Sequence, residues 1–411
     1  MTRPLATCAT PCGRSLPGRT VRWLALAGHL AGLAGCLLQF PERLPAPDAE
    51  PPDAAGDATT IQRERFDWEF GAFGVVADPA GALHGFEATG ATDAEGRVRF
   101  GRVMLDAHVV ISSTAEEPRS LGNSGFQIEL PDIGPLKDAH LVITRNDESG
   151  IGNAELVAAE GNWGGPIAIV RYGENQPTGS NEAPVDFRFV RIGAAQDSMG
   201  AAVARGGIGS ELFSLQNGVD DQGDALPPLV NAVVTSLPQG GFQVLDPVLP
   251  LRGIRGEGRG FLAALRYSAI SDNPQSGAVV RPLPELWLGT RTESRGPSGR
   301  ALEGRWRLGG VTLGDDGRWR SETYTLVFMV TEAAVRYVLE DTAGRSVEAG
   351  HADAQSGPML DLGGIVSLTP DGAMPAVRWF GMGPEAPPHL VLWGTDGRLP
   401  VARLFFGLRE R

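Results

Sequence analysis

Cysteine is almost absent from this sequence of 411 residues, which contains only Cys8, Cys12 and Cys36. Beyond position 36 the chain therefore has no thiol for a disulfide or for a cysteine-ligated metal centre. A chain of this length can bury enough apolar surface to be stable without such cross-links. Its stability is expected to come from hydrophobic cores.

Positive charge is also scarce. The formal net charge is -13, and Lys137 is the only lysine. A nucleic-acid-binding surface needs clustered basic residues, so nucleic acid is not expected as a partner. The glycine-rich turns at 122–125 and 207–210 lack the strand–helix context of a phosphate loop, and no cofactor is expected.

Recognisable catalytic and metal-binding motifs are absent as well. The histidines beyond the N-terminal region are not spaced like metal ligands, and there is no Gly-x-Ser-x-Gly nucleophile elbow. Asp220, Asp221 and Asp224 place hard oxygen ligands around glycine, which makes this stretch a candidate calcium site. It lacks the closing glutamate of an EF-hand loop, so a solvated acidic loop is the alternative interpretation.

Helical periodicity is scarce, whereas 56 glycines and 31 prolines punctuate short runs of Val, Ile, Leu, Phe and Thr. This pattern is typical of all-β sandwiches and barrels. We therefore predict an all-β fold, with a β-sandwich region of one or two domains over residues 63–290 and a polar linker at 291–300. The segment 92–100 resembles a hairpin of transthyretin-like sandwiches, with Gly96 in the left-handed turn position.

The N-terminal region has the pattern of an export signal. A basic arm precedes an apolar run from Trp23 to Gly35, which is shorter than the roughly 20 residues of a transmembrane helix. The run leads into Leu33-Ala34-Gly35-Cys36, which resembles the lipobox of bacterial lipoproteins at all its positions. That resemblance implies a signal peptide over residues 1–35 and an acylated Cys36, whose fatty chains would hold the protein on a bilayer. An ordinary cleaved signal is the alternative.

Residues 36–62 are rich in proline, alanine and acidic side chains without periodic apolar residues, which predicts a disordered tether. Leu37, rather than aspartate, follows the cysteine. By resemblance to enterobacterial sorting, this favours the outer membrane over the inner one. We therefore expect an envelope lipoprotein on the outer membrane, facing either the periplasm or the cell surface.

Residues 301–411 show the sharpest alternation of strand and turn, and Gly304-x-Trp306 lies on their first expected strand. The segment resembles a bacterial lipocalin-like domain, a small up-and-down β-barrel. In that family the tryptophan closes the barrel floor and an arginine on a late strand covers its ring, a role that Arg403 could play here. A generic sandwich is the alternative. The tryptophans that could line a barrel cavity, if they are not core residues, are Trp319, Trp379 and Trp393.

These features predict a non-enzymatic, lipid-anchored envelope protein that binds a small hydrophobic ligand or a protein partner through its β domains. One alternative is an envelope hydrolase acting on glycan or ester, with a site on the long middle loops. The other is a structural or assembly lipoprotein without a small ligand. Carboxylates or a Ser/His pair converging in a cleft would indicate the hydrolase, and a packed, cavity-free C-terminal barrel would indicate the assembly role.

Overall fold

The computed structural model describes residues between Arg65 and Glu410, all within the compact unit Ile61–Arg411. Within that range it does not describe positions 107, 116, 123–124, 160, 173–184, 196–197, 210, 221–223, 238–240, 247–249, 257–259, 269–282, 292–298, 332–333, 354–364, 373–376, 384–388 and 397–400. The predicted signal peptide, the acylated Cys36 and the tether lie outside the described residues and stay predictions.

The all-β prediction is confirmed. The described residues form 25 strands and one short 3₁₀ turn, η2 (Gly299–Ala301). Among these residues, no helix is long and apolar enough to span a membrane.

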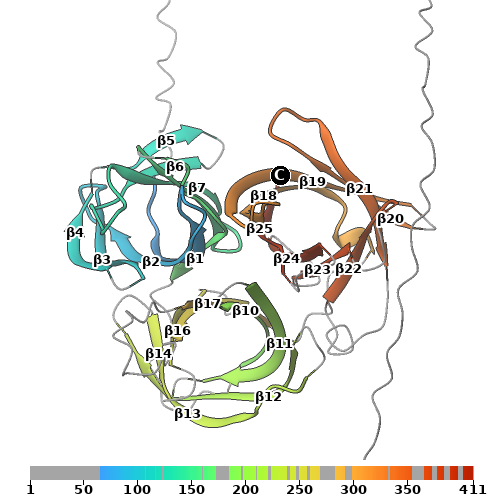
Figure 1. Ribbon diagram of the computed structural model, residues 1–411. Coiled ribbons are helices and arrows are strands. Elements are labelled where there is room, and N and C mark those ends of the chain that lie inside the picture. The colour runs from blue at the N-terminus through green and yellow to red at the C-terminus, as the bar shows by residue number, and fades with distance from the viewer. Residues whose placement is uncertain are drawn as a thin grey trace, which may run out of the picture. The chain divides into compact units, whose positions relative to one another are not determined.

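The first nine strands form one sheet in the order β4-β3-β2-β1-β9-β8-β7-β6-β5, which we call the first sheet (Figure 1). Every neighbouring pair is antiparallel, and β1 pairs with β9 in the middle of the sheet. The strands are β1 (Glu69–Ala77), β2 (Leu83–Thr92), β3 (Val98–Leu105), β4 (His108–Thr114), β5 (Arg119–Gly122), β6 (Gly125–Glu129), β7 (Ala139–Asn146), β8 (Ile151–Ala158) and β9 (Ile167–Tyr172).

The first sheet is open between β4 and β5, and the strand directions explain why. Because every neighbouring pair is antiparallel, the strand direction alternates outward from β1 on both sides. As a result β4 and β5 run in the same direction. Only residues 115–118 separate them in the chain, whereas a parallel pair needs a crossover of about a dozen residues or more. β4 and β5 therefore take the place of one interrupted strand, which pairs first with β3 and then with β6.

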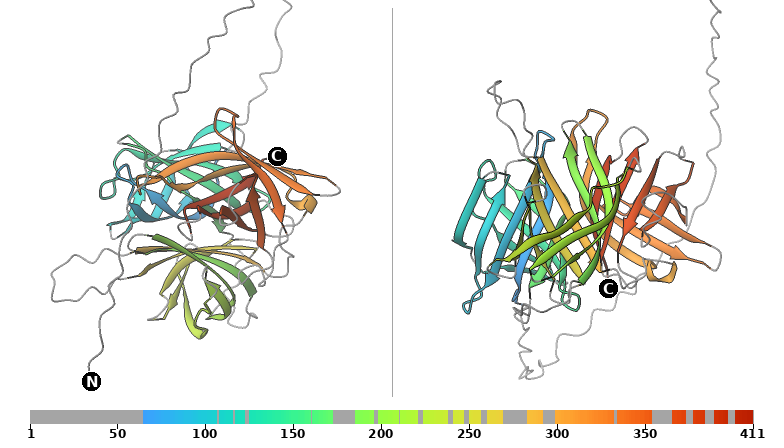
Figure 2. Two further views of the ribbon diagram at one scale, coloured as in Figure 1. Left: turned by 45° about the vertical axis from the view of Figure 1, so that its right-hand side comes forward. Right: turned by 90° about the horizontal axis from the view of Figure 1, so that it is seen from below.

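The remaining strands form two closed barrels of eight strands each (Figures 1 and 2). In both barrels consecutive strands pair, and the last strand closes on the first. The second barrel in the chain, which we call the C-terminal barrel, is an up-and-down barrel, as predicted for residues 301–411. The first of the two, the middle barrel, comprises β10 (Val185–Ala195), β11 (Ser198–Ile208), β12 (Leu212–Asp220), β13 (Leu229–Ser236), β14 (Gly241–Leu245), β15 (Leu251–Arg255), β16 (Phe261–Ser268) and β17 (Leu283–Arg291). The C-terminal barrel comprises β18 (Gly304–Leu313), β19 (Trp319–Val330), β20 (Val335–Glu340), β21 (Ser346–Asp353), β22 (Ile365–Pro370), β23 (Val377–Met382), β24 (His389–Asp396) and β25 (Arg403–Arg409).

The predicted N-terminal sandwich is not confirmed. The region 63–290 contains a curled sheet and a closed barrel rather than two facing sheets. Sandwiches and barrels both bury one face of each strand, so the same alternation of apolar and polar residues fits either. The difference is set by long-range pairing, such as that of β10 with β17, which the local sequence does not show.

The turn between β2 and β3 matches its prediction. Gly96 has a φ of 84°, in the left-handed region that glycine enters without a steric penalty. The Asp93 carboxylate closes the turn by accepting hydrogen bonds from the backbone N–H of Arg97 (2.9 Å) and from Nε of Arg99 (2.9 Å).

Each set of strands encloses an apolar core of its own, and a fourth core is common to all three. The first sheet surrounds Phe70 and Phe126, for example, and the middle barrel surrounds Phe189. The common core, which we call the shared core, combines side chains such as Val75 of β1, Val190 of β10 and Phe406 of β25. Because side chains alternate between the two faces of a strand, these are the faces turned away from each set's own core.

Polar contacts between the three sets of strands accompany the shared core. Arg252 of β15 donates a 2.6 Å hydrogen bond to Glu87 of β2, which is fully buried, and Arg307 of β18 donates to Glu155 of β8 at 3.2 Å. Burial raises the pKa of Glu87, and the charges of Arg252 and Arg102 oppose that rise.

His389, at the start of β24, is buried among aromatic rings. Its ring centroid lies 4.4 Å from that of Phe261 on β16 and 6.1 Å from that of Phe406. Neither ring nitrogen has a hydrogen-bond partner in the described part of the chain. Burial lowers the pKa of His389 to about 3, so the imidazole is neutral in the folded protein at neutral pH.

Candidate functional site

The C-terminal barrel contains a cavity of about 250 Å³ in which charged and aromatic side chains meet. Six of its strands contribute to the wall. The lining residues are Thr312 of β18, Glu322 and Tyr324 of β19, Leu339 of β20, Val347 and Glu348 of β21, Trp379 of β23 and Arg403 of β25.

Glu348 is the hub of the hydrogen bonds in this cavity. Its Oε1 accepts from the hydroxyl of Tyr337 at 2.8 Å and from Nε1 of Trp379 at 2.7 Å, and its Oε2 accepts from Nη1 of Arg403 at 2.8 Å. The Arg403 guanidinium also lies over the Trp379 ring, 5.0 Å from its centroid. Hydrogen bonds to a charged group are stronger than neutral ones, so these contacts hold Glu348 and Trp379 in fixed positions.

Glu322 is the second carboxylate of the cavity. Its Oε2 accepts from the Tyr324 hydroxyl at 2.6 Å and from Oγ1 of Thr312 at 2.7 Å. Neither of these donors carries a positive charge. The cavity wall therefore has two carboxylates and one guanidinium, that of Arg403, which gives it an excess of one negative charge.

The two tyrosines of this network stay protonated. Burial raises the pKa of Tyr324, and the hydrogen bond and charge of Glu322 raise it further. Burial also raises the pKa of Tyr337, helped by the charge of Glu348. Both hydroxyls therefore act as hydrogen-bond donors to a carboxylate at neutral pH.

Below this polar zone the barrel is filled with apolar side chains. The remaining space is about 10 Å³, which is at the limit for one water molecule. The apolar residues around it are Leu308, Leu326, Leu339, Leu368 and Leu392. Around these leucines the described residues leave no room for a hydrophobic molecule, and the cavity that they do form lies beside the charged groups.

Of the three tryptophans predicted to line a cavity, only Trp379 does so. Trp393 is fully buried in the shared core, where it stacks on Phe380 with a centroid distance of 5.8 Å, and Trp319 packs against the same core. Trp379 and Phe380 are neighbours on β23 and so point to opposite faces of the barrel wall. The prediction was wrong for Trp319 and Trp393 because aromatic content alone does not show which face a strand residue occupies.

The predicted pairing of Arg403 with Trp306 was also wrong. Trp306 is fully buried and donates from Nε1 to the carbonyl of Leu302, the residue after η2, at 2.9 Å. Gly304, two residues before Trp306, has a φ of 125°. In the pairing of β18 with β25, Arg409 lies opposite Trp306 and Arg403 lies opposite Thr312. Six residues of strand span roughly 20 Å, so Arg403 reaches Trp379 instead.

In the acidic stretch of the middle barrel, Asp220 and Asp224 are hydrogen-bonded to each other. Asp220 ends β12, and its Oδ1 accepts from the backbone N–H of Asp224 at 2.8 Å. Asp221 lies outside the described residues. Among those that are described, no group of three or more His, Cys, Asp or Glu residues is placed to hold a metal ion.

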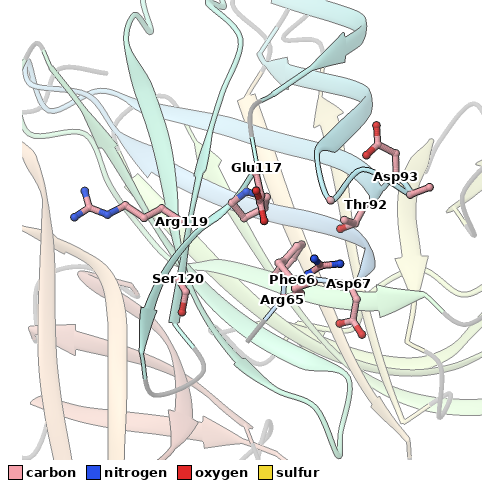
Figure 3. A pocket seen from close by; sticks show the side chains of 11 residues that line it. Arg65, Phe66, Asp67, Thr92, Asp93, Glu117, Arg119 and Ser120 are labelled. Carbon is pink, nitrogen blue, oxygen red and sulfur yellow. The ribbon is translucent and has the colours of Figure 1, made fainter. Parts of the chain in front are cut away.

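A second hollow, of about 840 Å³, lies beside the interruption between β4 and β5 (Figure 3). Its wall is formed by residues 65–67, 92–94, 96 and 117–120. Figure 3 shows Asp67, Asp93 and Arg119 pointing in different directions. Asp93 is already occupied by Arg97 and Arg99, so these charged groups do not converge on one position.

The sequence contains one signal for the polar cavity. Glu322 and Tyr324 are two residues apart on β19, so they share a face, as do Leu326 and Phe328 further along the strand. A polar pair continuing an apolar inward face indicates a barrel whose interior changes from apolar to polar. Glu348 has no comparable local signal, because its partners come from β20, β23 and β25.

No family model matches this sequence, and no curated protein matches it. Among solved structures, this protein is similar to a protein of unknown function of the DUF3598 family from Nostoc punctiforme, with 12% identity and a TM-score of 0.23, over 55% of this chain and 95% of that one. It is also similar to the isotype 1 transferrin binding protein B from serogroup B Neisseria meningitidis, with 8% identity and a TM-score of 0.25, over 80% of this chain and 64% of that one. Likenesses at this level carry no argument about family or function.

Proposed function

We propose that this chain is a lipid-anchored protein of the bacterial envelope whose C-terminal barrel binds a small cationic ligand without transforming it. The observation that supports ligand binding is the cavity wall of the C-terminal barrel. It holds Glu322 and Glu348 against a single guanidinium, that of Arg403. The lipobox-like segment ending at Cys36 supports the anchor.

The charge of the wall favours an amine, an amidine or a quaternary ammonium group. Glu348 is already bonded to Arg403, whereas the two donors to Glu322 are neutral hydroxyls. A ligand cation near Glu322 would neutralise the excess charge in a partly buried site, where Coulomb interactions are stronger than in water. The Trp379 ring, which lines the cavity, offers an apolar surface for the rest of the molecule.

The size of the cavity limits the ligand. Pockets for drug-sized ligands are typically about 300–1,000 Å³, and this one is about 250 Å³. The ligand is therefore small. The hydrophobic ligand expected from the sequence is replaced in this proposal by a polar one, because leucines fill the depth of the barrel.

Titration calorimetry on the full chain tests the ligand class. The probes are small alkylamines and tetramethylammonium, each compared with the alcohol and the carboxylate of similar size. The wild type should bind the cations and not their neutral or anionic counterparts. Glu322→Gln should weaken cation binding at least about tenfold, or about 1.4 kcal/mol, whereas Glu340→Gln should not.

Glu340 is the matched control because it bonds to Arg305 on the exposed side of the barrel. Equal affinity in the Glu322→Gln and wild-type proteins would refute the assignment of the site. If the wild type binds none of the probes, the proposed ligand class is refuted. The alternative that then remains is an assembly role in which no small ligand is bound.

That assembly role is favoured by an exposed apolar row on the middle barrel. Leu212 of β12, Val233 of β13 and Leu245 of β14 lie opposite one another and are exposed by 42%, 53% and 53%. The hydrolase alternative depends on the long middle loops, and residues 173–184 and 221–223 lie outside the described part of the chain.

Membrane fractionation of a bacterial host tests the anchor. The wild type should be found with the membranes, and Cys36→Ser should move to the soluble fraction because it has no thiol for the lipid. Membrane retention of the Cys36→Ser protein would refute lipid anchoring at this residue.

A further inference from the structure

Arg188 of β10 is a buried cation that has no counter-ion among the described residues. The side chain is only 4% exposed, and its Nε and Nη1 have no hydrogen-bond partner within the described residues. A guanidinium does not lose its proton in a protein, so the charge persists at neutral pH. Natural proteins pair nearly all of their buried charges, so this group requires an explanation.

The residues paired with Arg188 in the sheet make its charge harder to accommodate. Arg205 of β11 lies directly opposite on one side, and Thr290 of β17 lies opposite on the other. Burial lowers the pKa of Arg188, and the like charge of Arg205 lowers it further. Two arginines that lie directly opposite each other on neighbouring strands repel each other.

Thr290 supplies a second unsatisfied group at the same place. The residue is fully buried, and its Oγ1 has no hydrogen-bond partner in the described part of the chain. An unsatisfied buried hydroxyl is unfavourable, as is an unsatisfied guanidinium. Both groups are donors, and both would be satisfied by one acceptor that carries negative charge.

The position of Arg188 shows on which face this acceptor would lie. Phe187 and Phe189, its neighbours on β10, belong to the core of the middle barrel, whereas Val190 belongs to the shared core. Arg188 therefore faces outward, at the border of the shared core. Asp186 lies on the same face two residues earlier and is exposed.

We propose that Arg188, Thr290 and Arg205 bind a small inorganic oxyanion, such as phosphate or sulfate, on the outer face of the middle barrel. The planar guanidinium of Arg188 would donate two hydrogen bonds to the oxyanion, and the Thr290 hydroxyl a third. Arg205, which is exposed, would form the entrance and add a second positive charge. The burial of Arg188 admits a compact anion and excludes a large organic one.

Calorimetric titration of the full chain with inorganic phosphate, and separately with sulfate, tests this proposal at constant ionic strength maintained with chloride. The wild type should bind one anion saturably, and its thermal midpoint should rise with anion concentration. Arg188→Met should abolish binding, and Arg205→Met and Thr290→Val should weaken it at least tenfold. Arg336→Met, which removes an exposed cation from β20, should bind like the wild type.

A stability measurement separates a binding role from a structural one. In buffer without oxyanions, Arg188→Met should have a thermal midpoint equal to or above that of the wild type, because it removes an unpaired buried charge. A lower midpoint in that buffer would overturn the proposal by showing that the wild-type charge already has a partner. If Arg188→Met and the wild type bind phosphate equally, the proposal also fails. Arg205→Met provides the same binding test on an exposed residue if Arg188→Met does not fold.

Discussion

His389 should make the folded protein sensitive to acid. Its imidazole is packed between Phe261 and Phe406, and burial lowers its pKa to about 3 from an ordinary value of 6.5. Between these values the unfolded chain binds a proton that the folded chain does not. Stability therefore falls as the pH falls below 6.5, and the loss ends only near the folded pKa.

The size of the effect follows from this difference. Lowering the pH from about 7.5 to about 5 should cost about 2 kcal/mol from this one residue, at about 1.4 kcal/mol per pH unit below the unfolded pKa. Phenylalanine has a similar shape and no titrating nitrogen. His389→Phe should therefore gain about 2 kcal/mol relative to the wild type over the same change in pH.

His389→Phe should also be at least as stable as the wild type at about pH 7.5, because it removes two unsatisfied buried nitrogens. Urea unfolding of the two full chains, followed by tryptophan fluorescence at both pH values, measures the difference. His140→Gln is the control, since this side chain is partly exposed. A stability difference between His389→Phe and the wild type that does not change with pH would refute the reasoning.

Three further predictions concern stability. Arg252→Met should destabilise the protein by about 3–5 kcal/mol, measured by urea unfolding, because it leaves the buried carboxylate of Glu87 without its closest cation; Arg252→Met combined with Glu87→Met should recover much of that loss, and no recovery would contradict the explanation. Gly96→Ala should cost about 1 kcal/mol, seen as a lower thermal midpoint, because φ is 84° at this turn; an unchanged midpoint would show that the turn relaxes. Burial alone would raise the pKa of Asp78, but hydrogen bonds, chiefly from His84, lower it overall, so Asp78 stabilises the fold above its ordinary pKa of 3.8 and this contribution is lost as the pH falls through the lower folded value. Asp78→Asn should therefore be less stable than the wild type at neutral pH and should approach it in strong acid, and a constant difference in the unfolding midpoint would contradict this.

Local features of the fold could be predicted from the sequence, and features set by long-range pairing could not. The all-β class and the left-handed Gly96 follow from turn residues and short apolar runs. The eight-stranded C-terminal barrel followed from a resemblance carried by few residues. The closure of the middle barrel requires β10 to meet β17, and nothing in either strand indicates its partner.

The candidate site shows the same division. Trp379 was identified because aromatic residues are conspicuous, but the same reasoning included Trp319 and Trp393, which face the shared core. Glu348 was missed because its role depends on donors from three other strands. Arg403 was identified as an arginine that stacks on a tryptophan. The register between β18 and β25 places it away from Trp306, and the ring that it covers is that of Trp379.

The shared core has a consequence for how this protein can be divided and how it can change. Side chains of the first sheet, the middle barrel and the C-terminal barrel all contribute to it, for example Phe73, Leu288 and Trp393. A truncation that removed any one of the three would uncover an apolar surface on the other two and favour aggregation. A substitution on one of these outer faces likewise requires a compensating change in the side chains of the other units that pack against it in the shared core. The three units are therefore expected to be inherited, expressed and unfolded together, even though each has the strand connectivity of a separate domain.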